Sequence, residues 1–458
     1  MNNAGESTQL QVRANSIMEK GIELVDLFVN KNYLINIDKC EPVELEAWEK
    51  SFSYMSMFEI DKIVYDKNEN INDKLVSVYS ALSNFGSSAL LIIFSDADGV
   101  KFYLGTRDKN QPVVAKEILK KSLRGNFPGI EIKEQGSAQI ERLLEGNVPK
   151  EYANKAISSV SIVPSFRDDN KDHFVQGVEK FIDTMAGEKY TAVFVSSPLS
   201  KAALENKKRG YEELYTALSQ CAQLNLSYAE NSSEAIAIGV SDSFARAINE
   251  GISDTTGTNE STSTGTNKSR NKGSSWLGFF GITRTSGKSS GTSTGYSSGT
   301  TSSHTDTRSE TETDTKTTTD TKTTTTGTTS TLTVTRQNKT VLELLEKIDE
   351  QLDRIKNCES YGLWESACYF IADKPETSLV AANTYKALVA GEKTSVENSF
   401  INLWNNEFEN SDKSLMIMDY IRYGIHPSFK YLPPNADGKY AEQIITPASM
   451  ISGVELPT

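Results

Sequence analysis

Apolar residues gather in short runs separated by polar turns in the second fifth of the chain, a pattern typical of strands. The runs at residues 89–94 and 100–104 flank Asp98 and Gly99. This dipeptide tolerates the positive φ of a tight turn, so the two runs are predicted to form a β-hairpin.

A helix and a third strand are predicted directly after the hairpin. Apolar side chains recur at helical spacing over residues 113–123, Gly125 offers a left-handed stop, and residues 130–132 alternate as a strand. The order of strand, strand, helix and strand is half of a ferredoxin-like sandwich. Residues 1–82, with a helix near residues 16–28, are expected to form a helical arm before it.

A second α/β unit is predicted further along the chain. It begins with a strand at residues 158–163, a helix with an apolar stripe over residues 174–185, and a nearly all-apolar strand at residues 190–195. After a long excursion, residues 363–372 predict another strand and residues 377–390 a helix ended by a glycine.

The end of the chain completes this second unit. Residues 396–405 and 415–422 predict helical pieces, and residues 443–445 predict a late edge strand. The expected order is β-α-β, excursion, β-α-β. In a ferredoxin-like fold the second and third strands lie close together, so a long insertion there can leave and return at nearby points.

The excursion contains two amphipathic stripes that predict a helical hairpin. Helical spacing runs outward over residues 204–222 and resumes over residues 236–248. The return begins with Thr340 and Glu343, which fit a capping box, and continues to Ile355 at alternating four- and three-residue steps. Two such stripes that leave and re-enter one domain pair most simply as an antiparallel hairpin.

A polar tract separates the two stripes. Residues 252–335 consist mainly of Ser, Thr, Gly and Asn, and Asp-Thr-Lys-Thr-Thr-Thr occurs from Asp314 and again from Asp320. Such a tract buries too little apolar surface to offset its ordering entropy, so we expect it to be mobile at the tip of the hairpin.

The fold class predicted by these patterns is α+β, with ferredoxin-like βαβ units and a long antiparallel helical hairpin insertion tipped by a disordered Ser/Thr/Gly-rich tract. The expected parts are a helical N-terminal arm (1–82), a first α/β unit (83–157), a second α/β unit (158–200 and 359–458), the helical hairpin (201–251 and 336–358) and the low-complexity insertion (252–335).

Composition narrows the classes of protein. The chain has 458 residues, enough for about two or three domains with real cores, and its net charge of -13 argues against wrapping nucleic acid over the whole surface. The first residues lack a signal pattern, and no run approaches the roughly 20 apolar residues that span a bilayer. We therefore expect a cytoplasmic protein.

No catalytic or metal site is predicted from spacing. The four cysteines lack metal-type spacing and are expected to be reduced core residues, and the histidines, His173 and His426 among them, have no metal partners. Paired carboxylates such as Asp168 and Asp169 are expected to be solvated. The expectation is therefore a protein that is not an enzyme and has no cofactor.

Residues 287–289, Gly-Lys-Ser, resemble the end of a phosphate-binding loop. The preceding Gly281 is separated from Gly287 by five residues, whereas that loop requires four. No buried strand precedes the motif and no helix follows it. We interpret the match as a coincidence within Ser/Gly-rich sequence.

An apolar island flanked by basic residues lies inside the polar tract. Exposed to water it would be a sticky patch, so we expect it to contact another surface. Packing on its own hairpin or on a neighbouring subunit is favoured over a membrane or unpaired bases. The candidate contact residues are Trp276, Leu277, Phe279, Phe280, Ile282 and Arg284.

Three stretches carry a family resemblance. They are residues 84–94 with 102–106, residues 123–129 (Leu-Arg-Gly-Asn-Phe-Pro-Gly) and residues 445–456 (Ile-Thr-Pro-Ala-Ser-Met-Ile-Ser-Gly-Val-Glu-Leu). Together they resemble the region upstream of the motor in bacterial HerA-type ATP-binding proteins of the FtsK/HerA superfamily, which is related to type IV secretion ATPases. The shared motifs are structural and include no chemical signature.

The resemblance implies a role in assembly. It implies a homo-oligomer, with a ring of six subunits, and a non-catalytic module that positions partners or substrate for a ring ATPase that translocates DNA or protein. The family's phosphate-binding loop and magnesium-binding strand would follow Thr458, so the motor is expected in cis beyond that residue or in trans. DNA would be reached through the motor, and no stable membrane insertion is expected.

Two other classes of protein remain open at this point. One is a Ser/Thr-rich surface or interaction scaffold with no motor partner, for which Asn225 and Asn338 would be glycosylation sites in a secreted chain. The other is a self-standing enzyme, which would require a pocket with convergent titratable groups near His173 or His426.

Overall fold

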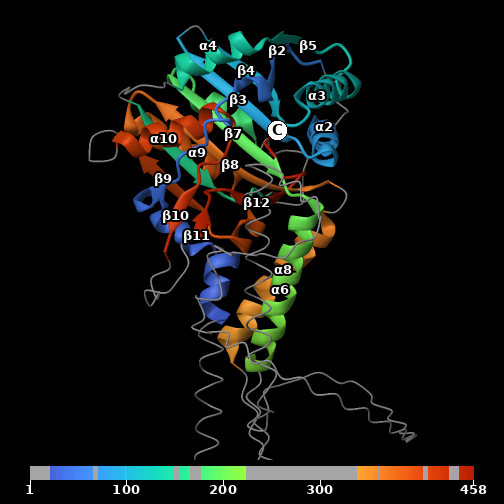
Figure 1. The fold of residues 1–458 in the computed structure, drawn as a ribbon, viewed down its shortest axis with the longest axis vertical. Coiled ribbons are helices and arrows are strands. Elements are labelled where there is room, and N and C mark those ends of the chain that lie inside the picture. Colours follow the sequence, from blue (N-terminus) through green and yellow to red (C-terminus); the bar gives the residue numbers. More distant parts are fainter. Residues whose placement is uncertain are drawn as a thin grey trace, which may run out of the picture.

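The computed structural model has a mixed α/β fold built on two antiparallel sheets (Figure 1). Among the described residues, the larger sheet has nine strands and the smaller has three. The structure describes residues 21–64, 71–97, 99–148, 155–165, 177–222, 338–358, 361–405, 411–432 and 443–457.

The first half of the larger sheet has the strand order β5-β2-β4-β3. The predicted hairpin is confirmed, because β3 and β4 pair from Ser88 and Arg107 to Asp96 and Gly99, and Gly99 has a φ of 129°. The elements of this half are β2 (Met55–Lys62), α2 (Ile71–Phe85), β3 (Ser88–Asp96), β4 (Gly99–Arg107), α3 (Pro112–Asn126), β5 (Glu131–Gln135) and α4 (Ser137–Asn147).

The second half has the same strand order read in the opposite direction across the sheet, β7-β8-β6-β9. It joins the first half through the β3–β7 pair. A further strand, β12, pairs with β8 off this path. The elements are β6 (Ala156–Ser161), α5 (Val178–Thr184), β7 (Tyr190–Pro198), β8 (Leu363–Ala372), α9 (Pro375–Val389), β9 (Phe400–Trp404), α10 (Ser411–Arg422) and β12 (Ser449–Ser452).

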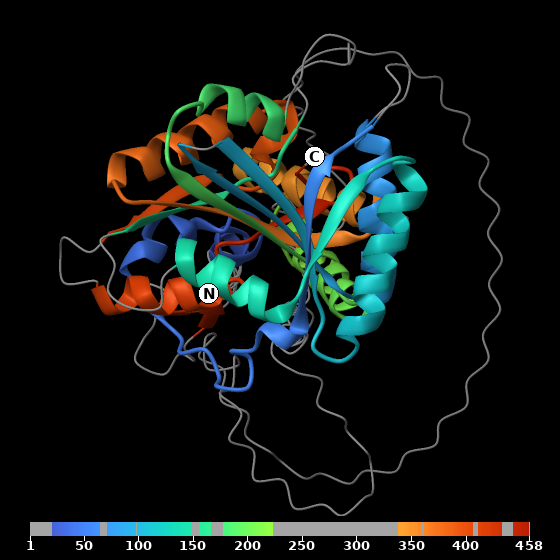
Figure 2. The same cartoon turned by 90° about the horizontal axis from the view of Figure 1, so that it is seen from above.

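Side-chain alternation along β3 separates two cores, because successive residues of a strand point to opposite faces. Ala89 packs with the cluster under α2 and α3, and Ile93 with the cluster under α5 and α9. Leu90 and Ile92 belong to the cluster of the other face, which includes residues of α4 and α10. The sheet therefore lies between two layers of helices (Figure 2).

Both outer edges of the larger sheet are protected. The edge strand β5 carries Glu131, Lys133 and Glu134, and charged edge strands resist pairing with another chain. The other edge, β9, is in contact with the 3-10 helix η2 (Asn32–Lys39). The smaller sheet lies beside this edge and consists of β1 (Glu41–Pro42), β10 (Phe429–Tyr431) and β11 (Gln443–Ile445).

Between β7 and β8 the chain forms a pair of packed helices, α6 (Lys201–Ala222) and α8 (Lys339–Asn357). At the far end the Asn338 main-chain N–H donates to the carbonyl of Ala222 at 3.2 Å, and at the sheet Leu199 N–H donates to Leu363 O at 2.8 Å. The helices therefore run antiparallel, and Figure 1 shows them side by side below the sheet.

One apolar cluster packs the helix pair against the rest of the fold. It joins Leu218 of α6 and Ile348 of α8 to Met450 of β12 and to the π-helix η1 (Val25–Val29). Most of the predicted apolar seam of α8 is buried. The N-cap of the helix is Asn338 and not Thr340 as predicted, because the Asn338 side chain accepts from Val341 N–H. Residues 236–248 and 252–335 lie outside the described residues.

The structure corrects four local predictions. Residues 400–404 are strand β9 and not helix, because pairing with β6 overrides a spacing that also fits a helix. Residues 443–445 do form a strand, but in the smaller sheet. The N-terminal segment contains strand β2 and is therefore not entirely helical. Gly125 lies inside α3, and Gly129 has the positive φ, 87°.

Gly424, after α10, is expected to resist substitution. Its φ is +67°, and a Cβ there would lie 2.8 Å from Leu90 Cδ1. Because the left-handed backbone conformation costs free energy for residues with a Cβ, Gly424→Ala should lower the free energy of unfolding by at least about 1–2 kcal/mol. Gly125→Ala, within α3 and with nothing within 4 Å of its Cβ, should raise it by about 0.5–1 kcal/mol. Urea denaturation tests both, and equal effects would contradict this explanation.

Candidate functional site

A cavity of about 560 Å³ lies where the helix pair meets the sheet. Its walls come from the segment around η1 and η2, from the start of α6, and from the loops that follow α2, β4 and α10. The volume falls within the usual range of small-molecule pockets. It is therefore the candidate functional site in the described part of the chain.

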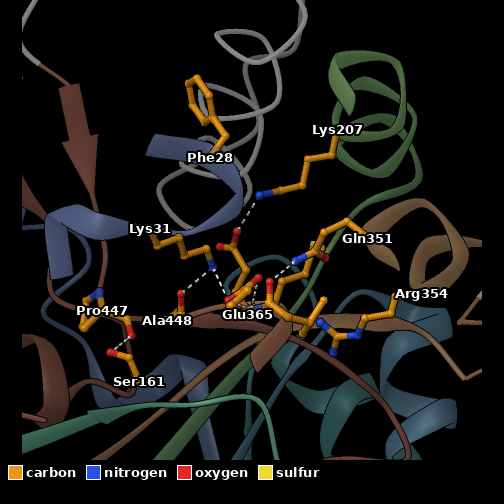
Figure 3. Close-up of polar contacts among 12 residues, drawn as sticks. Phe28, Lys31, Ser161, Lys207, Gln351, Arg354, Glu365, Pro447 and Ala448 are labelled. Atoms are coloured by element: carbon orange, nitrogen blue, oxygen red, sulfur yellow. Dashed lines mark hydrogen bonds and ion pairs between the residues drawn. The ribbon is translucent and has the colours of Figure 1, made fainter. Parts of the chain in front are cut away.

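Lys31 forms a buried clamp at one wall of this cavity. Its ammonium lies 3.0 Å from the Glu397 carboxylate and donates to the carbonyl of Ala448 at 3.0 Å (Figure 3). Glu397 also accepts from the main-chain N–H of Met450 at 3.2 Å. The clamp thus ties the N-terminal segment to β12 and to the segment before β9.

The backbone at Lys31 is strained. Its φ of 53° makes it the one non-glycine residue with positive φ among those that the structure describes. Such conformations cost free energy and persist where the surroundings determine them. Here the determinants are the ion pair and the carbonyl contact of the ammonium.

Glu365, on β8, forms the second ion pair of this wall. Its carboxylate lies 3.2 Å from the ammonium of Lys207 on α6 (Figure 3). Burial alone would raise the pKa of Glu365, but the charges of Lys207 and Lys31 lower it, and the net shift is downward. The pair therefore connects the helix pair to the sheet with Glu365 ionised.

His426 lines the cavity as a neutral ring. Burial lowers its pKa to about 4, and its exposed fraction is 3%. Nε2 lies 3.0 Å from the carbonyl of Glu365, to which it donates, and Nδ1 accepts from the Tyr369 hydroxyl at 2.9 Å. Both nitrogens therefore have partners in the neutral tautomer, and burial keeps the pKa low although the bond to the Glu365 carbonyl raises it.

The buried ring predicts a pH dependence of stability. The pKa of His426 is about 4 in the folded state and 6.5 as the unperturbed value. The contribution of the neutral His426 ring to the free energy of unfolding is fully present above pH 6.5. It is lost as the pH falls toward 4, because the imidazole binds a proton more strongly in the unfolded chain than in the folded one. At pH 5 the loss is about 2 kcal/mol. Urea denaturation at pH 7.5 and 5.0 should show this loss in the native chain but not in His426→Gln. An equal loss in both would contradict it.

A third contact connects α8 to the C-terminal segment. Arg354 donates to the Glu455 carboxylate at 2.7 Å. On the same helix, Gln351 Nε2 donates to the carbonyl of Val396 at 3.3 Å (Figure 3). Glu455 also accepts from Ser452 N–H at 2.7 Å. Together with the Lys31 clamp, these bonds hold β12 against the base of the helix pair.

The charged groups around Lys31 are paired with one another. The ammonium groups of Lys31 and Lys207 face Glu397 and Glu365, and His426 is held neutral between two partners. This arrangement joins the N-terminal segment, the segment before β9, strand β8 and the helix pair. Within the described ranges, no three His, Cys, Asp or Glu side chains come close enough to hold a metal ion.

Most of the candidate residues from the sequence lie outside the described residues. These are Trp276, Leu277, Phe279, Phe280, Ile282 and Arg284, the Gly-Lys-Ser motif at 287–289, and His173. Cysteines 221, 358 and 368 are buried, Cys40 is half-buried, and none of the four is in a disulfide in the described part of the chain. Among the described helices, none is long and apolar enough to cross a bilayer.

Sequence reasoning missed the Lys31 clamp and the Glu365 pair. Lys31, Glu365 and Glu397 are separated by hundreds of residues or lie in unrelated elements, so no local spacing connects them. One signal was present, because Glu365 is a carboxylate inside the apolar run 363–372 and such a residue requires a partner when the strand is buried.

Comparison with known proteins adds no relative: no family model and no curated protein matches this sequence. The site is therefore interpreted from its own geometry.

Proposed function

We propose that this chain is a non-catalytic assembly or substrate-positioning module of a HerA/FtsK-like ring ATPase that translocates DNA or protein. The observation that carries the proposal is the helix pair α6/α8, which leaves the larger sheet between β7 and β8 and returns at the same place. The two helix ends that residues 223–337 connect, at Ala222 and Asn338, lie at the far end of the pair from the sheet.

The strand order of both halves of the sheet fits the fold that this proposal expects. Their strand orders, β5-β2-β4-β3 and β7-β8-β6-β9, correspond to two βαββαβ units, which we propose are ferredoxin-like and related by an internal duplication. The helix pair is then an insertion between the second and third strands of the second unit. In this proposal the units pack between subunits of a homo-oligomeric ring of six.

The protected sheet edges favour contacts through the helix pair. Because β5 is charged and β9 is covered by η2, strand addition at either edge is disfavoured. The rooted base of the pair, with the Lys31 clamp and the Arg354–Glu455 contact, supports a firm connection between the helices and β12. In this proposal residues 223–337 are the contact or gating element, and the motor lies in cis beyond Thr458 or in trans.

Sedimentation velocity of the full chain, alone and with a HerA-type ATPase of the same organism, tests the proposal. We expect self-association toward a ring and co-sedimentation with the ATPase. A monomer at micromolar concentration that sediments independently of the ATPase would contradict it.

A further inference from the structure

Arg107, the last residue of β4, lines the same cavity with an incompletely paired guanidinium. Its exposed fraction is 7%. Nη2 lies 3.5 Å from the main-chain carbonyl of Glu49, a long hydrogen bond, and Nε has no hydrogen-bond partner. The guanidinium also lies 5.6 Å from the centre of the Tyr54 ring. None of these contacts supplies a counter-charge.

The neighbouring carboxylates offset this charge only in part. Burial lowers the pKa of Arg107 by more than Glu49 and Asp108 raise it, so the net shift is downward. Asp108 already accepts from the Ser87 hydroxyl at 2.7 Å and from the N–H groups of Asn110 and Gln111 at 2.8 and 2.7 Å. Glu49 is 1% exposed, and burial raises the pKa of its carboxyl by more than the charge of Arg107 lowers it. Among the described residues, Arg107 forms no ion pair with either carboxylate.

The lining of the cavity keeps a surplus of positive charge even after Lys31 is paired with Glu397 and Lys207 with Glu365, although the net charge of the chain is -13. The start of α6 also faces the cavity, with Ser200 capping the helix by accepting from Ala203 N–H at 3.1 Å. Helix N-termini favour anions. The cationic lining residues are Lys31, Arg107, Lys109, Lys201 and Lys207, and the acidic ones are Asp108 and Glu365.

A buried guanidinium stays protonated, so burying its charge costs desolvation free energy unless an opposite charge compensates it. Its planar fork matches the oxygens of a phosphate or a carboxylate. The volume of about 560 Å³ exceeds what a single oxyanion needs, and Phe28, Tyr33 and Tyr420 line part of the remainder. A ligand with an anionic head and a planar or apolar body fits this lining.

We propose that the cavity at the base of the helix pair binds a small organic oxyanion, with Arg107 as the residue that contacts its phosphate or carboxylate group. The proposal is independent of the assembly function, since it depends only on the cavity and its lining. The shared chemistry is the oxyanion, and phenyl phosphate and benzoate distinguish the two head groups.

Isothermal titration calorimetry of the full chain with phenyl phosphate, benzoate and inorganic phosphate, at constant ionic strength, tests this proposal. We expect saturable binding of phenyl phosphate or benzoate at one site, and weaker binding of inorganic phosphate because it lacks the planar body. Arg107→Gln should weaken binding roughly 10- to 100-fold, the loss of a charge-assisted hydrogen bond. Arg124→Gln, which removes an exposed arginine of α3, should leave the affinity unchanged.

Arg107→Lys is the second variant, because it keeps the charge and removes the fork. It should bind more weakly than the native chain, and it carries the test if Arg107→Gln does not fold. No saturable binding of either aromatic probe, or equal affinity in the native chain and the Arg107 variant, would overturn the proposal.

Discussion

Replacing Lys31 by methionine is expected to lower the free energy of unfolding by about 3–5 kcal/mol, the cost of leaving one member of a buried ion pair alone. Methionine keeps most of the apolar stem of lysine, so the loss reports mainly on the charge. The Glu397 side chain is fully buried, and its remaining contact is the N–H of Met450. Urea denaturation at pH 7 measures the effect.

Two further variants separate the ion pair from other effects. The double variant Lys31→Met with Glu397→Gln should recover part of the loss, because no buried charge remains without a partner. Lys133→Met removes an exposed member of the Lys133–Asp61 pair, whose atoms lie 2.8 Å apart, and should not change stability measurably. A double variant less stable than Lys31→Met would show that the clamp does not act as a pair.

Truncating Ile348 to alanine is expected to cost about 2–5 kcal/mol, as for other fully buried isoleucines. Ile348 lies on α8 with an exposed fraction of 0%, in the cluster shared with α6, η1 and β12. Leu342→Ala on the same helix is the matched control, because Leu342 is 41% exposed and should change stability by less than about 0.5 kcal/mol. Equal losses would mean that the two helices do not pack as described.

The elements predicted well from the sequence are those with a strong local signal. Strand β8 was predicted at its observed bounds, because ten residues with an almost continuous apolar pattern between polar turns leave little alternative. The β3–β4 hairpin followed from the turn at Gly99, and the buried stripe of α8 followed from its spacing.

The elements predicted wrongly depend on partners that are distant in sequence. The segment containing β9 has a spacing that fits a helix, and it becomes a strand only because β6 offers a pairing edge. Similarly, β11 pairs with β10 in a second sheet that no local pattern indicates. Strand β2 was missed because its run, Met55–Lys62, is half polar.

The candidate site was the least predictable part of the chain. The Lys31–Glu397 pair joins residues 366 positions apart, a separation for which single-sequence patterns carry no information. Arg107 follows a strand and resembles any surface arginine in the sequence. Its burial depends on the segment that contains Glu49 and Tyr54, a contact that only the folded structure reveals.

The central claim is that residues 223–337, presented by the helix pair, contact the partner. Because Asn338 N and Ala222 O are 3.2 Å apart, a linker of about five residues can replace this segment without separating α6 from α8. Sedimentation velocity of this shortened chain with the HerA-type ATPase tests the claim most directly. We expect a melting temperature close to that of the full chain and loss of co-sedimentation. Retention of co-sedimentation at the same affinity would contradict the claim.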